Sequence, residues 1–295
     1  MKKTIFSGSG VALVTPLGAD GINYDSFGRL IDFQIECGTD ALIVCGTTGE
    51  APTLDDGEHL DAIEFAAERA NGCVPVIAGT GSNNTDHAIM MSKEAAKRGA
   101  DGLLWVSPYY NKATQRGLIK HYQALAGATD LPAILYNVPS RTGVDILPAT
   151  IKELSAIDTI VAVKEATGNV ARAAQIIAEC GDDIDVYSGN DDITVPLMSI
   201  GAKGVISVLA NIMPAETSEM CRFCIEGDFA SAAQMQLGFD ELVRALFCEV
   251  NPIPVKTALN LMGFDVGELR LPLCEMSDEH LEFLKGAMRK HGIEI

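Results

Sequence analysis

The sequence predicts a (β/α)8 barrel, a TIM barrel, with a C-terminal helical appendage. Short apolar runs alternate with amphipathic stretches along the 295 residues, and no polar linker interrupts them. The runs recur about every 20–33 residues, which is the repeat of one strand and one helix. An open dinucleotide-binding sheet would need G-x-G-x-x-G after its first strand, and neither Gly8-Ser-Gly10 nor Gly79-Thr-Gly81 has the third glycine. Eight repeats in one direction therefore favour a closed barrel.

Eight short apolar runs are expected to form the strands. They are residues 11–15, 41–45, 75–78, 102–106, 133–136, 160–164, 185–188 and 204–208. Helix signals fill the intervals. Thr53-Leu-Asp-Asp56 resembles a capping box, and residues 61–69 continue with apolar side chains on one face. Residues 85–98 and 114–126 repeat the amphipathic pattern, as the barrel requires.

The chain after the eighth run reads as helical to its end. Residues 213–248 are mostly helical, Asn251-Pro-Ile-Pro-Val-Lys256 leads into a helix that ends near residue 262, and residues 278–291 form the last helix. This tail is longer than one closing helix of a barrel. We expect residues 1–225 to form the catalytic barrel and residues 226–295 to form a helical region suited to oligomerisation.

Composition excludes several classes of function. A formal net charge of −18 argues against nucleic acid or an anionic membrane as a partner. No long apolar segment follows the two early lysines, so neither a signal peptide nor a membrane span is expected, and the protein should be cytoplasmic. The eight cysteines show no disulfide framework. Cys221 and Cys224 form a C-x-x-C without a second ligand pair at zinc spacing, so no metal site is expected.

Lys164 is the most informative residue because it ends a run that reads as a strand buried on both faces. Burial removes the hydration of an ammonium group and so favours the neutral amine. A neutral amine on a rigid strand can attack a carbonyl and form a Schiff base. The alternative is a structural lysine that reaches the barrel rim or pairs with Glu165.

Polar residues follow other strands at the same end of the barrel, where active sites of this fold lie. Gly46-Thr-Thr-Gly-Glu50 follows the second run, and its amides and hydroxyls can cradle a carboxylate, although it also fits an ordinary βα turn. Tyr136 ends the fifth run and should face Lys164 across one strand spacing of ~5 Å. Arg141 lies in the next loop, where it either binds a second carboxylate or is a surface arginine.

Five collinear motifs resemble the dihydrodipicolinate synthase family, the pyruvate-dependent class I aldolase-type enzymes of lysine biosynthesis. They are Gly46-Thr-Thr-Gly-Glu50, Pro108-Tyr-Tyr-Asn111, Tyr136-Asn-Val-Pro-Ser-Arg-Thr-Gly143, Lys164-Glu-Ala-Thr-Gly-Asn169 and Asn251-Pro-Ile-Pro-Val-Lys256. The resemblance runs from about Ser7 to the C-terminus. It implies 4-hydroxy-tetrahydrodipicolinate synthase activity on pyruvate and L-aspartate 4-semialdehyde, in the diaminopimelate route. It also implies that no metal or organic cofactor is needed.

The resemblance implies catalytic roles for Lys164, Tyr136, Thr48 and Tyr110, and a role in pyruvate binding for Thr47. Lys164 would form the imine with pyruvate, and Thr47 and Thr48 would bind the carboxylate of that substrate. Thr48, Tyr136 and Tyr110 would form a proton relay. In this family the tyrosine at the position of Tyr110 reaches into the active site of the neighbouring subunit. The active unit would then be a dimer, usually one of two in a homotetramer.

The remaining implied residues bind the second substrate or line the pocket. Arg141 would hold the carboxylate of aspartate semialdehyde. Gly189 and Ile206, on the seventh and eighth strands, would shape the pocket. Asn190 stands where a second acid is expected in this family, and the consequence of that departure is open.

A regulatory site is only partly matched. Relatives inhibited by lysine bind it at the dimer interface, and His59, Asn83 and Tyr109 match that site. Asp56 and His87 stand where a histidine and a glutamate are expected. The acid that would grip the lysine ammonium group is therefore missing, and we expect weak or absent inhibition by L-lysine.

Two alternatives remain. One is a related class I aldolase acting on a 2-keto sugar acid, of the N-acetylneuraminate lyase type. Arg141 argues against it, because a polyhydroxylated substrate would need hydroxyl-binding side chains at that position. The other is a catalytically silent relative that binds a small ligand. Such a protein is expected to lose a member of the relay, and here the lysine, both tyrosines, both threonines and the arginine are all present.

Overall fold

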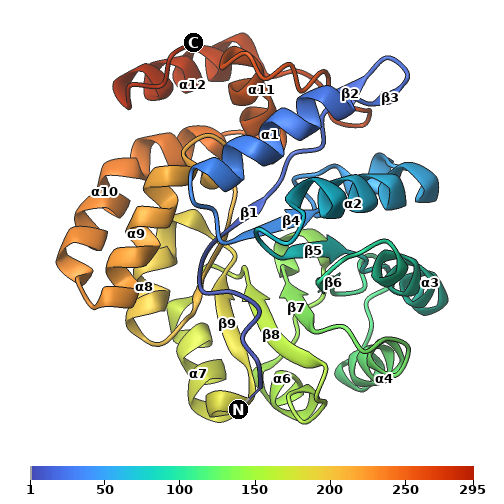
Figure 1. The fold of residues 1–295 in the computed structure, drawn as a ribbon. Helices are drawn as coiled ribbons and strands as arrows, with labels where there is room; N and C mark the ends of the chain where they lie inside the picture. The colour runs from blue at the N-terminus through green and yellow to red at the C-terminus, as the bar shows by residue number, and fades with distance from the viewer. Residues whose placement is uncertain (1) are drawn as a thin grey trace.

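The computed structural model describes residues 2–295, and its centre is a closed barrel of parallel strands (Figure 1). Around the barrel the strands follow the order β1-β10-β9-β8-β7-β6-β5-β4. They are β1 (Gly8–Ala12), β4 (Ala41–Val44), β5 (Val76–Gly79), β6 (Gly102–Val106), β7 (Ala133–Asn137), β8 (Ile160–Glu165), β9 (Asp185–Ser188) and β10 (Gly204–Ser207). The predicted (β/α)8 architecture is confirmed.

The first strand lies three residues earlier than predicted. Residues 11–15 were expected, whereas β1 begins at Gly8 and pairs there with Gly204 of β10. A Cβ on Gly204 would lie 1.9 Å from the carbonyl oxygen of Gly8, so only glycine allows the two strands to meet. Glycine and serine have low strand propensity, and this hid the start of the strand. Each of the other seven predicted runs overlaps an observed strand.

Helices surround the barrel and continue beyond its last strand (Figure 1). They are α1 (Tyr24–Glu36), α2 (Asp56–Ala70), α3 (Thr85–Lys97), α4 (Gln115–Ala126), α5 (Pro139–Thr142), α6 (Pro148–Leu154), α7 (Val170–Cys180), α8 (Thr194–Ser199), α9 (Pro214–Glu226), α10 (Phe229–Leu246), α11 (Ile253–Leu261) and α12 (Asp278–Lys290). No helix within residues 2–295 combines the length and apolar character needed to cross a membrane.

The capping box at the start of α2 was assigned to the wrong residues. Asp55, not Thr53, is the N-cap, and it accepts a hydrogen bond from the Glu58 amide while the Glu58 side chain accepts one from the Asp55 amide. Thr53 instead closes a short 3-10 turn, donating its hydroxyl to the Glu50 carbonyl. The predicted and observed capping boxes are offset by two residues. Thr53 belongs to the 3-10 turn after Glu50, so the cap of α2 falls on Asp55.

The core has two parts, one between the barrel and its helices and one inside the barrel. The inner part takes alternate residues of the strands, including Ile43, Leu104 and Ile134, as the two-residue period of a strand requires. Phe6 stacks on Tyr187 at 4.3 Å between ring centroids, and the Tyr187 hydroxyl donates to the Phe6 carbonyl at 2.6 Å. The barrel interior is therefore packed with side chains and is not a pore.

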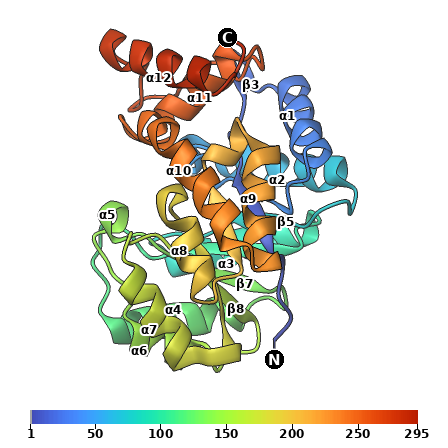
Figure 2. The ribbon, with the colours of Figure 1, turned by 90° about the vertical axis from the view of Figure 1, so that its left-hand side faces the viewer.

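The segment that follows α11 lies beside α1 and a small hairpin that the sequence did not predict. This hairpin pairs β2 (Leu17–Gly18) with β3 (Gly21–Ile22). In both views α11 lies near it and near α1 (Figures 1 and 2). The Leu17 amide donates to the Val266 carbonyl at 3.0 Å, and Arg29 donates to the Phe264 carbonyl at 2.9 Å. The proposed division of the chain at residue 225 stays a prediction.

Candidate active site

Lys164 lies near the C-terminal end of β8 and is only 6% exposed. It pairs in register with Tyr136 of β7, and its Nζ atom lies 4.4 Å from the centroid of the Tyr136 ring. The prediction that these two residues face each other on neighbouring strands is confirmed. Within residues 2–295 the Lys164 amine has no carboxylate at ion-pair distance, so it remains available for chemistry.

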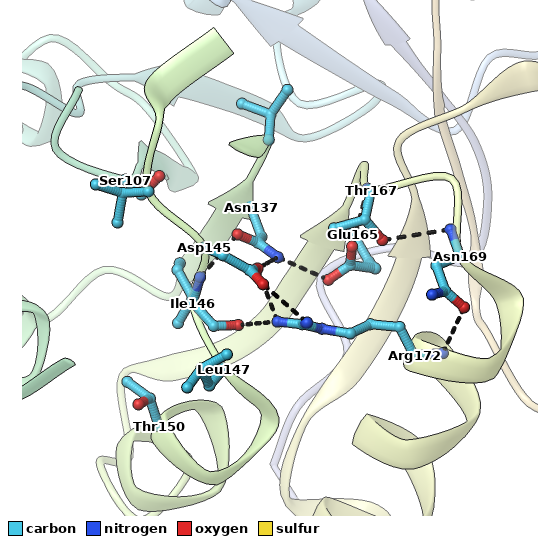
Figure 3. A network of polar contacts seen from close by, with 12 residues as sticks. Ser107, Asn137, Asp145, Ile146, Leu147, Thr150, Glu165, Thr167, Asn169 and Arg172 are labelled. Atoms are coloured by element: carbon cyan, nitrogen blue, oxygen red, sulfur yellow. Dashed lines mark hydrogen bonds and ion pairs between the residues drawn. The ribbon is translucent and has the colours of Figure 1, made fainter. Parts of the chain in front are cut away.

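Glu165 points to the opposite side of the strand and does not neutralise Lys164. Figure 3 shows it in a polar network outside the barrel, where Asn137 donates to Glu165 and to Asp145 at 3.0 Å each. Arg172 binds Asp145 with two hydrogen bonds, at 2.9 and 2.7 Å. Asn137 and Glu165 are paired in register directly after Tyr136 and Lys164. The network therefore ties β7 to β8 at the level of the candidate catalytic pair.

The Gly46–Glu50 loop (residues 46–50) follows β4 at the same end of the barrel. It is closed by hydrogen bonds from the Gly49 amide to Gly46 and from the Glu50 amide to Thr47, at 3.1 and 3.2 Å. The amides of Thr47 and Thr48 donate to no acceptor within residues 2–295, as a carboxylate cradle requires. Thr48 is buried, and its Oγ1 accepts a hydrogen bond from Asn251 at 3.0 Å.

A buried ion pair anchors the end of this loop. Glu50 has a left-handed backbone with φ of 54°, and its fully buried side chain accepts from Lys256 at 2.5 Å and from the Arg270 amide at 3.0 Å. Lys256 also donates to the Glu268 carbonyl at 2.7 Å. Burial is the larger influence on the pKa of Lys256 and lowers it, whereas Glu50 raises it. A strained backbone held by a buried pair keeps the loop in one conformation.

Arg141 and Tyr110 are both exposed in this chain. Arg141 sits on α5, is exposed, and donates to the Asn251 carbonyl at 3.1 Å. Tyr110 is 87% exposed, has φ of 72°, and donates its amide to the Thr142 carbonyl at 3.2 Å. Within residues 2–295 of a single chain, Tyr110 forms no hydrogen bond with Thr48, so the three-residue relay stays a prediction.

Gly189 directly follows β9 and Ile206 lies on the neighbouring strand β10, and their role in lining the pocket stays a prediction. The Gly189 amide donates to the Glu165 carbonyl at 2.8 Å, and a Cβ at Gly189 would lie 2.5 Å from the Cβ of Ala166. Only glycine fits there without movement. Ile206 is 1% exposed and belongs to the inner core together with Tyr136. Gly189 therefore adjoins β8, the strand of Lys164, and Ile206 lies in the same core cluster as Tyr136.

Asp191 is the buried acid of this segment, and it was not among the predicted site residues. Its carboxylate accepts from the Ser207 hydroxyl at 2.5 Å and from the amides of Val208 and Leu209 at 3.0 and 3.1 Å. Burial raises its pKa, and these donors together with the charge of Lys164 lower it. Asn190 next to it donates its amide to the Ser188 hydroxyl oxygen at 3.2 Å. In an acidic chain, the adjacent pair Asp191 and Asp192 gives no signal that one of them is buried.

The residues of the expected regulatory site gather around α2 and α3. His59 is buried, with Nε2 2.7 Å from the Gly79 carbonyl oxygen, and burial lowers its pKa. His87 Nε2 lies 2.9 Å from Asp56 Oδ1 on the surface. The Asn83 carbonyl accepts from Asn111 at 2.9 Å, next to Tyr109 and Tyr110. The Asp56 carboxylate is therefore paired with His87 and is not left free to bind a lysine ammonium group.

The fold and the buried lysine together define a class, the barrel lyases of the class I aldolase type. The profile described as the "Dihydrodipicolinate synthetase family" matches residues 5–291, and the chain belongs to this family. It is 53% identical over 290 residues to 4-hydroxy-tetrahydrodipicolinate synthase of Thermoanaerobacter sp. (strain X514), covering 98% of each chain.

Two solved structures agree with this assignment. Dihydrodipicolinate synthase from Aquifex aeolicus superposes with a TM-score of 0.97 at 47% identity, covering 98% of this chain and 99% of that one. The chloride-inhibited dihydrodipicolinate synthase from Acinetobacter baumannii, complexed with pyruvate, gives 0.96 at 46% identity, with 98% and 100% covered. These relatives, which are 46–53% identical over nearly the full chain, are all dihydrodipicolinate synthases, an enzyme also named 4-hydroxy-tetrahydrodipicolinate synthase.

Proposed function

We propose that this protein condenses pyruvate with L-aspartate 4-semialdehyde to form 4-hydroxy-tetrahydrodipicolinate. The observation that carries the proposal is the buried Lys164 amine at the end of β8, in register with Tyr136 and without a carboxylate partner in the described chain. Such an amine suits nucleophilic attack on a ketone. The names of the relatives and the pyruvate bound in the Acinetobacter baumannii structure support the same reaction.

The first half of the reaction forms an enamine. The Lys164 amine attacks the ketone carbon of pyruvate, and the carbinolamine loses water to give the imine. Loss of a methyl proton then places the electron pair on carbon and yields the enamine. Thr47 and Thr48 hold the pyruvate carboxylate, with their free amides as additional donors. Thr48, Tyr136 and Tyr110 carry protons between the amine, the leaving water and solvent.

The second half joins the substrates and frees the enzyme. The enamine carbon attacks the aldehyde carbon of aspartate semialdehyde, and the aldehyde oxygen takes a proton to become the hydroxyl group. Arg141 holds the carboxylate of this substrate through charge-assisted hydrogen bonds. The substrate amine then attacks the imine carbon and displaces the Lys164 amine. One water leaves in the whole cycle, and no metal or organic cofactor takes part.

A shared active site is part of the proposal. Tyr110 is 87% exposed and has a backbone φ of 72°, which is strained for a residue other than glycine. Within residues 2–295 of an isolated chain, no packing of the Tyr110 side chain compensates for this strain. A second copy of the chain would cover Tyr110 and place its hydroxyl beside the partner's relay. We propose a dimer as the active unit, and two dimers in a homotetramer.

The first experiment measures the initial rate with both substrates, coupled to the NADPH-dependent reductase that consumes the product. NADPH oxidation that requires both substrates supports the proposal, and Lys164→Ala should abolish it. Borohydride with pyruvate should add one reduced pyruvyl group to wild type and none to Lys164→Ala. Pyruvate that is trapped without turnover of aspartate semialdehyde would favour the sugar-acid aldolases. Failure of both assays would favour a silent relative.

A further inference from the structure

We propose that Asn251 positions both halves of the active site and sets the direction of the Thr48 hydroxyl proton; this inference rests on the proposed function. Asn251 directly precedes the Pro252 N-cap of α11 and is 5% exposed. Its side-chain Nδ2 donates to Thr48 Oγ1 at 3.0 Å, and its main-chain carbonyl accepts from Arg141 at 3.1 Å. One residue therefore contacts both the keto-acid side and the semialdehyde side of the site.

The direction of the bond to Thr48 follows from the amide group. An asparagine amide donates only through Nδ2, so Thr48 Oγ1 is the acceptor and keeps its own proton to donate. The Asn251 Oδ1 atom is buried and has no partner within residues 2–295. Turning the amide over would leave Nδ2 as the unpaired atom, and a buried donor without a partner is rarer than an under-satisfied carbonyl oxygen. The Thr48 proton thus points to the substrate or the relay.

The position of Asn251 is fixed from a second side. Five residues later, Lys256 forms the buried ion pair with Glu50, the last residue of the Gly46–Glu50 loop. The loop and the start of α11 are therefore joined at two places, at Thr48–Asn251 and at Glu50–Lys256. Two bonds between the same segments leave little freedom for Asn251 to move away from Thr48.

Aspartate at position 251 gives the decisive test, because it keeps the shape of asparagine and reverses the bond. A carboxylate only accepts hydrogen bonds, so it would draw the Thr48 proton toward itself. It would also place a negative charge beside the bound carboxylate of pyruvate. A role limited to packing predicts the reverse order, in which the isosteric Asn251→Asp is milder than Asn251→Ala.

The experiment compares kcat and the KM for each substrate in wild type, Asn251→Ala, Asn251→Asp and the control Asn260→Ala. Asn260 lies on the same helix, and within residues 2–295 its side chain bonds Val266 and Gly267 and no residue of the candidate site. We expect Asn251→Ala to lower kcat/KM for pyruvate by about tenfold, and Asn251→Asp to lower it further. Asn260→Ala should keep wild-type kinetics at a temperature where it is folded.

Thermal unfolding of each variant separates kinetic loss from loss of fold. An Asn251→Asp enzyme that is folded and as active as wild type, or more active than Asn251→Ala, would overturn the proposal. If Asn251→Asp does not fold, the proposal is judged on Asn251→Ala alone, and unchanged kcat/KM for pyruvate refutes it. A wild-type enzyme without turnover would instead refute the proposed function.

Discussion

Replacing Lys256 by methionine should destabilise the protein more than any surface change of the same kind. Glu50 and Lys256 are 0% and 1% exposed, so Lys256→Met leaves the Glu50 carboxylate buried without its counter-charge. The change also removes the donor to the Glu268 carbonyl. Removing one partner of a buried pair costs about 3–5 kcal/mol, and we expect a loss of this size in the free energy of unfolding.

The loss can be measured by urea unfolding and by calorimetry. In a chain of this size each kcal/mol lowers the melting temperature by about 2 °C, so Lys256→Met should melt about 6–10 °C below wild type. Lys97→Met is the matched control, because Lys97 pairs with Glu94 on the surface with 69% of its side chain exposed. That pair should contribute about 0–1 kcal/mol.

A double variant distinguishes an unpaired charge from lost packing. In Glu50→Gln with Lys256→Met no charge remains buried, so about half of the loss should return. The folded fraction of Lys256→Met should also show a higher KM for pyruvate, because Glu50 anchors the loop that carries Thr47 and Thr48. Lys256→Met with the same stability as Lys97→Met would refute the role assigned to this pair.

Three further predictions concern assembly, regulation and pH. Mixed dimers of Tyr110→Phe and Lys164→Ala chains should be more active than either parent, because one site then holds both wild-type residues; activity no higher than the parents' would refute the shared site. L-lysine should inhibit weakly or not at all, since Asp56 binds His87, and millimolar inhibition would contradict this. Burial lowers the pKa of His121 from 6.5 to about 4, so the unfolded chain binds its proton first on acidification. The free energy of unfolding should therefore fall by about 3 kcal/mol between pH 6.5 and pH 4, and His121→Gln should flatten this acid limb in urea titrations.

The barrel was predictable from the sequence because its strands are apolar and evenly spaced. The position of Lys164 and its register with Tyr136 followed from the same pattern, since neighbouring parallel strands place their last residues together. The start of β1 could not be predicted in this way. Its close contact with β10 at Gly8 requires small residues, and small residues in a sequence are typical of a loop. The hairpin β2–β3 is too short to show a period.

The support of the candidate site was harder to predict than the site itself. The motif from Asn251 to Lys256 was noticed, yet its contacts with Thr48 and Glu50 span about 200 residues of sequence. One amino-acid sequence contains no signal for a contact between residues so far apart in the chain. A lysine in an apolar helix was the one available signal, because buried lysines need a partner.

The seam between β1 and β10 bears on how the chain folds during synthesis. β1 pairs with β4 on one side, which is made soon after it, but its other edge waits for β10. A ribosome adding 5–20 residues per second needs on the order of ten seconds for the roughly 160 residues between β4 and β10. During that time β1 presents an unpaired edge with small side chains, open to pairing with other nascent chains. Synonymous codons that slow translation downstream of β4 should therefore lower the yield of folded protein, although they leave the amino-acid sequence unchanged.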